Sequence, residues 1–199
     1  SNVQHGTDLQ SRKNRGVMHK FPYMLAGFLF FALPVAAQEA QNAKNLHELF
    51  RRSWEFELDE DPLFATHLGP NKDNDKLPSA TLADIQRRRK VKRGFLSEAL
   101  AIDRDTLTLP DQMNLSVFRQ LQEIELAELA FPSHLIPISN RSGFHISFAE
   151  LPKRVPLQTV RDYENYISRL KDFQRYGNEQ IDLLRAGIDR NWVLPSVVL

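Results

Sequence analysis

The sequence predicts an all-α protein with a helical bundle-like architecture and one long irregular loop. Three observations support this prediction. Apolar residues recur at steps of three and four positions through most of the chain after residue 42, which places them on one face of each helix. Residue types that cap helix N-termini precede these segments, and Phe131–Pro156 is the long stretch without a helical pattern.

The first predicted helix covers Ala43–Leu58. Its apolar stripe consists of Leu46, Leu49, Phe50, Trp54 and Leu58. Asp61 is placed to cap a short second helix, Pro62–Leu68, because aspartate is a good N-cap and proline is favoured in the first helical turn. Gly69 and Pro70 then end that helix. The polar connection 71–80 is rich in turn formers, so we expect it to be exposed.

Threonine caps predict the three remaining helices. Thr81 begins a helix that reaches about Ile102. Thr108 begins a helix with an apolar side made of Leu115, Phe118, Leu121, Ile124 and Leu129. Thr159 begins the last helix, with Asp162 at the spacing of a capping box. Its apolar pattern continues to residue 188, and we expect Gly177 to kink or split it.

The irregular segment Phe131–Pro156 contains four prolines and is longer than an ordinary connection between helices. Loops of this length often carry function. Residues 145–151 fit a short strand, although one segment makes no sheet. Arg141, His145 and Glu150 are the candidates in this segment for facing a cleft. The alternative is that they satisfy the loop's own backbone or meet solvent.

Residues 18–37 have the pattern of a signal peptide. Lys20 supplies the positive end, Phe21–Leu33 is an apolar run, and Val35–Ala37 offers small residues for cleavage before Gln38. The alternative is a retained membrane anchor. Against it, the run falls short of the roughly 20 residues that span a bilayer, and Pro34 interrupts it.

The domain organisation follows from this leader. Residues 1–17 precede the expected start and are interpreted as vector-derived or translated upstream sequence. Residues 38–199 are predicted to form one exported helical domain, periplasmic or secreted, that touches the membrane only through its leader. The chain ends on three apolar residues, so we expect this domain to be truncated at its C-terminus. The sequence has no cysteine, which excludes disulfides and thiolate metal sites.

Charge gives little reason to expect a nucleic-acid partner. Four of the 26 basic residues and one of the 25 acidic residues lie in residues 1–38, so the mature chain has 22 basic and 24 acidic residues and a net charge of −2. The local exception is residues 86–93, where six of eight residues are basic. This run lies in a predicted helix and has no interleaved aromatic residue to stack on bases, which favours a solvated helix face over a nucleic-acid site.

His47 and Glu48 match half of a zinc-peptidase motif, whose second histidine follows the first by one helical turn. Arg51 occupies that position, and a guanidinium has no lone pair to donate to a metal. We therefore interpret His47 and Glu48 as surface residues of an amphipathic helix. The sequence shows no metal-binding or catalytic constellation elsewhere.

Six segments in a fixed order carry a resemblance to a known family: LHELFRRSWEFELDEDPLFATHLG, DKLPSATLADIQRRR, LTLPDQMNLSVFRQLQEIELAEL, LIPISNRSGFHISFAELP, TVRDYENYISRL and LLRAGIDRNWVLPSVVL. Together they cover nearly all of residues 43–199. This succession resembles the N-terminal third of the exported bacterial family catalogued as domain of unknown function 885. The resemblance implies a mostly helical protein similar to zinc metallopeptidases of the His-Glu type, with peptides as substrates.

In such enzymes the metal ligands and the general base lie later in the chain, so the resemblance assigns no catalytic or metal-binding residue here, and zinc is implied only for the full-length family member. We expect this chain to be the N-terminal, non-catalytic helical portion of an exported zinc-dependent peptidase-like hydrolase. It would form one wall of a substrate cleft, with a missing C-terminal catalytic portion as its partner, and would expose apolar surface along its last helix. The alternative is a self-contained periplasmic helical binding module in which Phe131–Pro156 contacts a partner.

Overall fold

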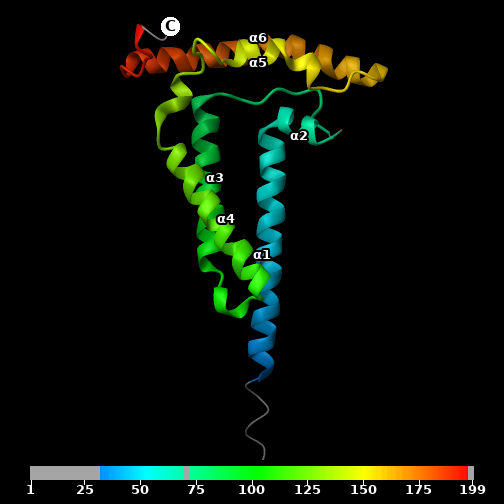
Figure 1. Cartoon of the computed structure of the whole chain (residues 1–199), viewed down its shortest axis with the longest axis vertical. Coiled ribbons are helices and arrows are strands. Elements are labelled where there is room, and N and C mark those ends of the chain that lie inside the picture. Colours follow the sequence, from blue (N-terminus) through cyan, green and yellow to red (C-terminus); the bar gives the residue numbers. More distant parts are fainter. Residues whose placement is uncertain (1–31, 70–71, 197–199) are drawn as a thin grey trace, which may run out of the picture. The chain divides into compact units, whose positions relative to one another are not determined.

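The computed structural model describes residues 32–69 and 72–196 (Figure 1). The chain divides into two units, Ser1–Ala36 and Ala37–Leu199, and the packing described below belongs to the second. The described residues form helices and no strand, with one isolated bridge between Ile138 and Gly143. The all-α prediction is thus confirmed for this part of the chain. None of the described helices is long and apolar enough to cross a membrane.

In chain order the helices are α1 (Ala32–Glu60), α2 (Pro62–Leu68), α3 (Leu82–Ala101), η1 (Arg104–Thr106), α4 (Leu109–Glu128), η2 (Pro132–Leu135), α5 (Phe144–Ala149), η3 (Leu151–Lys153) and α6 (Val160–Asp189). The four predicted caps, Asp61, Thr81, Thr108 and Thr159, all accept hydrogen bonds from backbone N–H groups of the first turn. α1 is longer than predicted at its start. Most of the predicted signal peptide lies outside the described residues.

The main core lies between α1, α3 and α4. α3 and α4 form an antiparallel pair beside α1 (Figure 1). Their buried apolar residues, together with one from the connection before α4, are Leu46, Leu49, Phe95, Ala99, Ile102, Leu107 and Leu115. At its centre Leu46, Ala99 and Leu115 are fully buried, so the core excludes water as a hydrophobic core should.

Lys92 joins the same three helices through charge. It lies on α3, and its ammonium donates to Glu57 of α1 and to Glu125 of α4, the latter at 2.6 Å. Burial lowers the pKa of Lys92, but the bonds to Glu125 and Glu57 outweigh it, and the net result is a raised pKa. A buried ammonium needs such partners, because burying its charge without them costs on the order of several kcal/mol.

A second, smaller core holds α6 against the connection before α3 and against η2. Its buried residues are Ala80, Ile85, Leu135 and Leu183. Gly187 makes this approach close: a Cβ there would lie 2.9 Å from the carbonyl oxygens of Leu135 and Trp192. A larger residue at 187 would push η2 away from α6.

Arg169 of α6 is the most deeply buried charged side chain, with 1% of its surface exposed. Its guanidinium donates to the carbonyl oxygens of Lys76, Asp73 and Pro62 at 2.8, 3.3 and 3.1 Å, and to Thr66 Oγ1 at 2.7 Å. These acceptors lie on α2 and on the connection after it. One side chain therefore fixes α2 and the backbone of residues 73–76 to α6.

The described part of this connection, residues 72–80, is consequently less exposed than predicted. Asp73, Asn74 and Leu77 are buried, because the backbone around them turns its carbonyl groups toward Arg169. Arg175, also on α6, approaches the carbonyls of Leu77 and Pro78, both at 3.4 Å. The side chains of Lys72 and Lys76 stay exposed, so the segment combines a path around two arginines with contact with water.

Three further expectations were wrong. Residues 145–151 form no strand, because most of them lie in α5. Two aromatic residues of that helix, Phe144 and Phe148, contact α6. Gly177 does not split α6, which is continuous from Val160 to Asp189. Leu121 and Ile124 of α4 are 51% and 45% exposed instead of facing the core.

Trp54 is likewise half exposed, at 50%, although its spacing placed it on the buried stripe of α1. Ser53 and Phe56 face the bundle in its place. The buried face of α1 thus follows residues 46, 49, 53 and 56, which rotates Trp54 to the edge of the contact.

Replacing Arg169 should destabilise the whole unit. In Arg169→Leu the buried carbonyls and the Thr66 hydroxyl lose a charged donor, and we expect a loss of about 3 kcal/mol or more in the free energy of unfolding, measured in urea. Arg161→Leu is the matched control on the same helix, since Arg161 is 74% exposed, and should change stability by no more than about 0.5 kcal/mol. Equal losses in the two variants would contradict the role given to Arg169.

Lys92 should make stability depend on alkaline pH. Its pKa is raised in the folded state above the ordinary 10.5, so its contribution is fully present below that pH and is lost as the pH rises through the folded-state pKa. Wild type should therefore exceed Lys92→Met by a constant free energy near neutral pH, and this difference should shrink above about pH 10.5. Lys90→Met, at an exposed position of α3, is the control. A difference that stays constant to pH 11.5 or so would refute the coupling.

Candidate functional site

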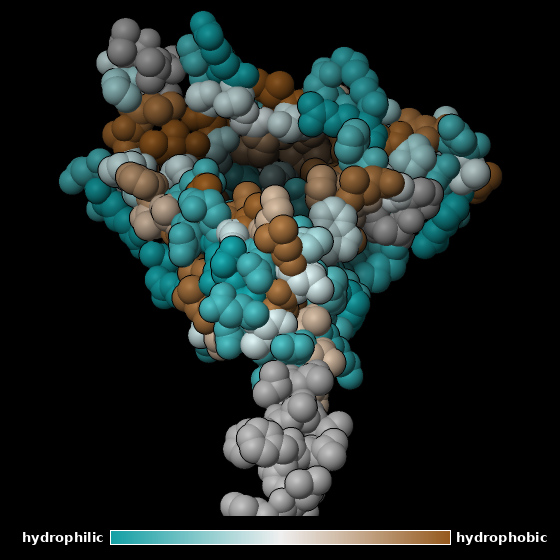
Figure 2. Space-filling model, turned by 60° about the horizontal axis from the view of Figure 1, so that its bottom comes forward, coloured by the Kyte–Doolittle hydropathy of each residue, from teal (hydrophilic) through white to brown (hydrophobic). Residues whose placement is uncertain are grey.

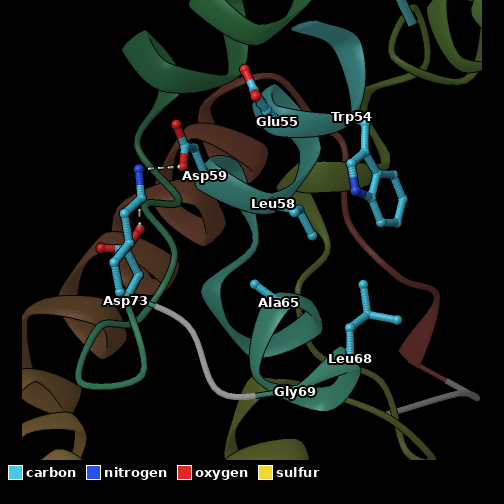
Figure 3. A pocket seen from close by; sticks show the side chains of 9 residues that line it. Trp54, Glu55, Leu58, Asp59, Ala65, Leu68, Gly69 and Asp73 are labelled. Carbon is cyan, nitrogen blue, oxygen red and sulfur yellow. Dashed lines mark ion pairs between the residues drawn. The ribbon is translucent and has the colours of Figure 1, made fainter. Parts of the chain in front are cut away.

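Two surface cavities flank α2. The first, which we call the Trp54 cavity, has a volume of about 510 Å³ and lies between α1, α2 and the start of the connection after α2 (Figure 3). Leu58, Ala65 and Leu68 supply apolar lining, and Trp54 stands at one side. Trp54 meets Phe64 edge to face, with ring centroids 6.0 Å apart. This cavity has an apolar floor and an aromatic wall.

The charged groups of the Trp54 cavity are already paired. Lys72 Nζ lies 2.9 Å from Asp59 Oδ1 and 4.0 Å from Asp73 Oδ2. The hydrogen bond to Asp59, followed by the charge of the same carboxylate, raises the pKa of Lys72. Glu55 accepts from Arg51 at 2.6 Å. The rim is therefore a set of ion pairs, which leaves the apolar floor as the main surface for binding.

The second cavity, the Arg154 cavity, has a volume of about 500 Å³. It lies on the other side of α2, between that helix, the segment of α5 and η3, and α6. Its polar lining residues are Asp61, His67, Ser147, Arg154 and Tyr176, and its apolar lining residues are Leu63, Phe64, Pro78, Leu151 and Val155. Both cavities thus use α2, and Phe64 of the second touches Trp54 of the first.

Aromatic packing places α5 beside the Arg154 cavity. Phe148 stacks on Phe173 of α6, with centroids 4.0 Å apart and planes at 21°. Phe144, one turn earlier, contacts Phe173 and Tyr176 at 6.2 and 6.0 Å. Because two rings on one face of α5 meet two rings of α6, the intervening Ser147 is held at the cavity.

The three residues proposed from the sequence lie apart from both cavities. Arg141 is exposed in a turn that Ser139 closes, where its own N–H donates to Ser139 Oγ at 3.3 Å. His145 is exposed on the first turn of α5. Glu150 caps the end of α5 and pairs with Lys153 at 2.6 Å, and this bond lowers its pKa. None of the three lines the Trp54 or the Arg154 cavity.

The cavity residues that sequence reasoning missed are His67, Ser147, Arg154 and Tyr176. Ser147 and Arg154 belong to the same irregular segment, Phe131–Pro156, as the residues proposed from the sequence. Which of its side chains faces a cavity depends on α5 being a helix and on the direction in which it docks. Neither follows from a pattern in the sequence, and only the unusual length of the segment pointed there.

Three of the six basic residues in the run at residues 86–93 are paired within the protein. Arg87 donates to both oxygens of Glu60 at 2.7 Å, and Arg88 reaches Glu60 at 3.2 Å. Lys92 is the buried link between three helices. The absence of a nucleic-acid partner stays a prediction, and this pairing agrees with a structural role for the run.

Among residues 32–69 and 72–196, no group of three or more histidines and carboxylates is arranged to hold a metal ion. His47 Nε2 lies 3.3 Å from Asp111, and Glu48 pairs with Arg51. The described residues therefore do not fit a zinc ion.

A family model described as "Bacterial protein of unknown function (DUF885)" matches residues 62–199 of the chain. Comparison with curated proteins and with solved structures gives no match. The matched region begins at the first residue of α2 and includes most of the residues that line the two cavities.

Removing the aromatic stack should release α5 locally. Phe148→Ala deletes a ring that is stacked on Phe173, and we expect a cost of about 1–3 kcal/mol together with faster hydrogen exchange of the α5 amides, while α3 and α4 keep their protection. Ile146→Ala, 42% exposed on the same helix, should leave exchange nearly unchanged. An equal rise of exchange in α3 and α4 would show that α5 does not open separately.

Proposed function

Since the chain belongs to the DUF885 family of bacterial proteins of unknown function, we propose that it is the non-catalytic N-terminal helical portion of an exported zinc-dependent peptidase-like hydrolase, where it forms one wall of a substrate cleft. The observation that carries this proposal is that α4 and α6 each have an uncovered apolar face. One face of each helix packs within the unit, and the other is uncovered.

On α4 the uncovered face consists of Leu109, Met113, Val117, Leu121 and Ile124, each between 45% and 68% exposed. These residues recur at steps of four and three, so they form one stripe along the helix. The opposite face, with Leu115 and Phe118, packs in the main core. A helix that is apolar on opposite sides is typical of the interior of a larger protein.

The uncovered face of α6 consists of Val160, Tyr163, Ile167, Leu170, Ile181 and Ile188. Steps of three and four residues connect them, with Gln174, Gly177 and Leu184 at the intervening positions, and this is the spacing of a helix-packing seam. The face toward the unit carries Arg169, Gln180, Leu183 and Gly187. Figure 2 shows hydrophobic residues reaching the surface in several patches. Such patches mark interaction surfaces, since exposed apolar area costs about 25 cal/mol per Å².

The chemistry of the described residues is consistent with a cleft wall that leaves catalysis to another portion of the hydrolase. They offer cavities and apolar surfaces but no ligand set for zinc, so the catalytic metal and its general base are assigned to the partner portion of the hydrolase. The portion described here would contribute shape and contacts to a peptide in the cleft. The Trp54 and Arg154 cavities supply recessed surface for that role.

The proposal is tested by assaying the purified chain for peptide hydrolysis with and without added zinc. We expect no hydrolysis, because the described residues contain no group arranged to hold a metal ion. Hydrolysis that persists through purification and disappears with a chelator would overturn the proposal.

A second experiment tests the uncovered seam. The triple variant Ile167→Gln, Leu170→Gln, Ile181→Gln should bind less of a hydrophobic-surface dye and self-associate less, while its free energy of unfolding changes little. Leu183→Gln, on the covered face, is the matched control and should cost about 3 kcal/mol or more. A wild-type chain that stays monomeric, binds no dye and unfolds cooperatively would favour the self-contained binding module instead.

A further inference from the structure

The Arg154 cavity is lined by a cationic side chain that has no partner among the described residues. The guanidinium of Arg154 makes no hydrogen bond or ion pair with the described residues, and only its backbone N–H donates, to Leu151. The Trp54 cavity differs, because its lysine is paired with Asp59. A guanidinium offers five donors in a planar fork, so Arg154 presents an unfilled site for an anion.

Nearby carboxylates do not cancel this charge by direct contact. Asp61, which also lines the cavity, accepts hydrogen bonds at Oδ1 from the N–H groups of Leu63 and Phe64, at 3.1 and 2.9 Å. Glu150, a few residues before Arg154, pairs with Lys153 at 2.6 Å. Each carboxylate therefore has its own partner, and Arg154 is left to a ligand.

The remaining lining suits an uncharged, apolar group. Phe64, Leu151 and Val155 supply aromatic and aliphatic surface. Burial raises the pKa of Tyr176, so its phenol is neutral across the physiological range and acts as a hydrogen-bonding group rather than an anion. The cavity volume of about 500 Å³ lies within the range of roughly 300–1,000 Å³ that is usual for small-ligand sites.

We propose that the Arg154 cavity binds a carboxylate joined to an apolar group, the chemistry of a peptide C-terminus whose last residue is aliphatic or aromatic. Arg154 pairs with the carboxylate through two parallel N–H···O bonds, and the apolar side chain lies against Phe64, Leu151 and Val155. This inference stands without the hydrolase proposal, because binding is expected of this chain by itself. It also names the part of a peptide that this wall would hold.

The test compares N-acetyl-leucine with its amide, which has the same shape and no charge. Titration followed by NMR should show that the acid binds at least about tenfold more tightly than the amide, since charged hydrogen bonds are stronger than neutral ones. Arg154→Gln should weaken binding of the acid by about tenfold or more and leave binding of the amide unchanged. Arg154 is exposed, so this variant should fold normally.

Arg141→Gln is the matched control, because Arg141 is an exposed arginine of the same segment outside the cavity. It should bind the acid as wild type does. Equal affinity for acid and amide, or an Arg154→Gln variant that keeps full affinity for the acid, would overturn the inference. So would inorganic phosphate binding as tightly as the acid, since the apolar walls would then contribute nothing. None of these results would affect the hydrolysis and seam experiments, so failure of the two proposals can be told apart.

Discussion

The contact between Arg169 and the backbone of α2 and its following connection is the constraint on which the candidate site depends. An arginine that is almost fully buried without a directly contacting carboxylate is costly, and burial lowers its pKa. The cost is offset by three carbonyl groups and one hydroxyl aimed at a single guanidinium. Since those acceptors come from two segments, the arginine sets the position of α2, and α2 is the wall that the Trp54 and Arg154 cavities share.

The rest of the unit is held in two ways that differ in kind. Between α1, α3 and α4 an ordinary apolar core is supplemented by Lys92, whose two carboxylate partners lie on different helices and so fix the helices' mutual positions. Around α6 the apolar core is small, and arginines that bind backbone carbonyls replace much of it. Hydrogen bonds depend on direction, whereas apolar packing does not. The position of α6 is therefore well defined even though its apolar core is small.

The uncovered faces of α4 and α6 explain why the sequence looks more apolar along these helices than the packing requires. Leu121 and Ile124 satisfy the spacing of an amphipathic helix, but a second stripe with the same spacing, which includes Leu115, is the one that packs inside. Periodicity identifies a helix with apolar faces; it does not say which face meets which neighbour when two are present. The same ambiguity placed Trp54 in the core, whereas it stands half exposed at a cavity.

The sequence by itself determined α2, α3, α4 and α6 and their starts, because capping is local: Asp61, Thr81, Thr108 and Thr159 each bind N–H groups within a few residues. It also indicated that the segment before α6 is unusual. Only the tertiary structure decided that residues 73–76 turn their carbonyl groups toward Arg169, that α5 is a helix docked by Phe148 on Phe173, and that Arg154 rather than Arg141 lines a cavity. Each of these outcomes rests on contacts between residues far apart in the chain, whose partners and directions leave no period or motif in the local sequence.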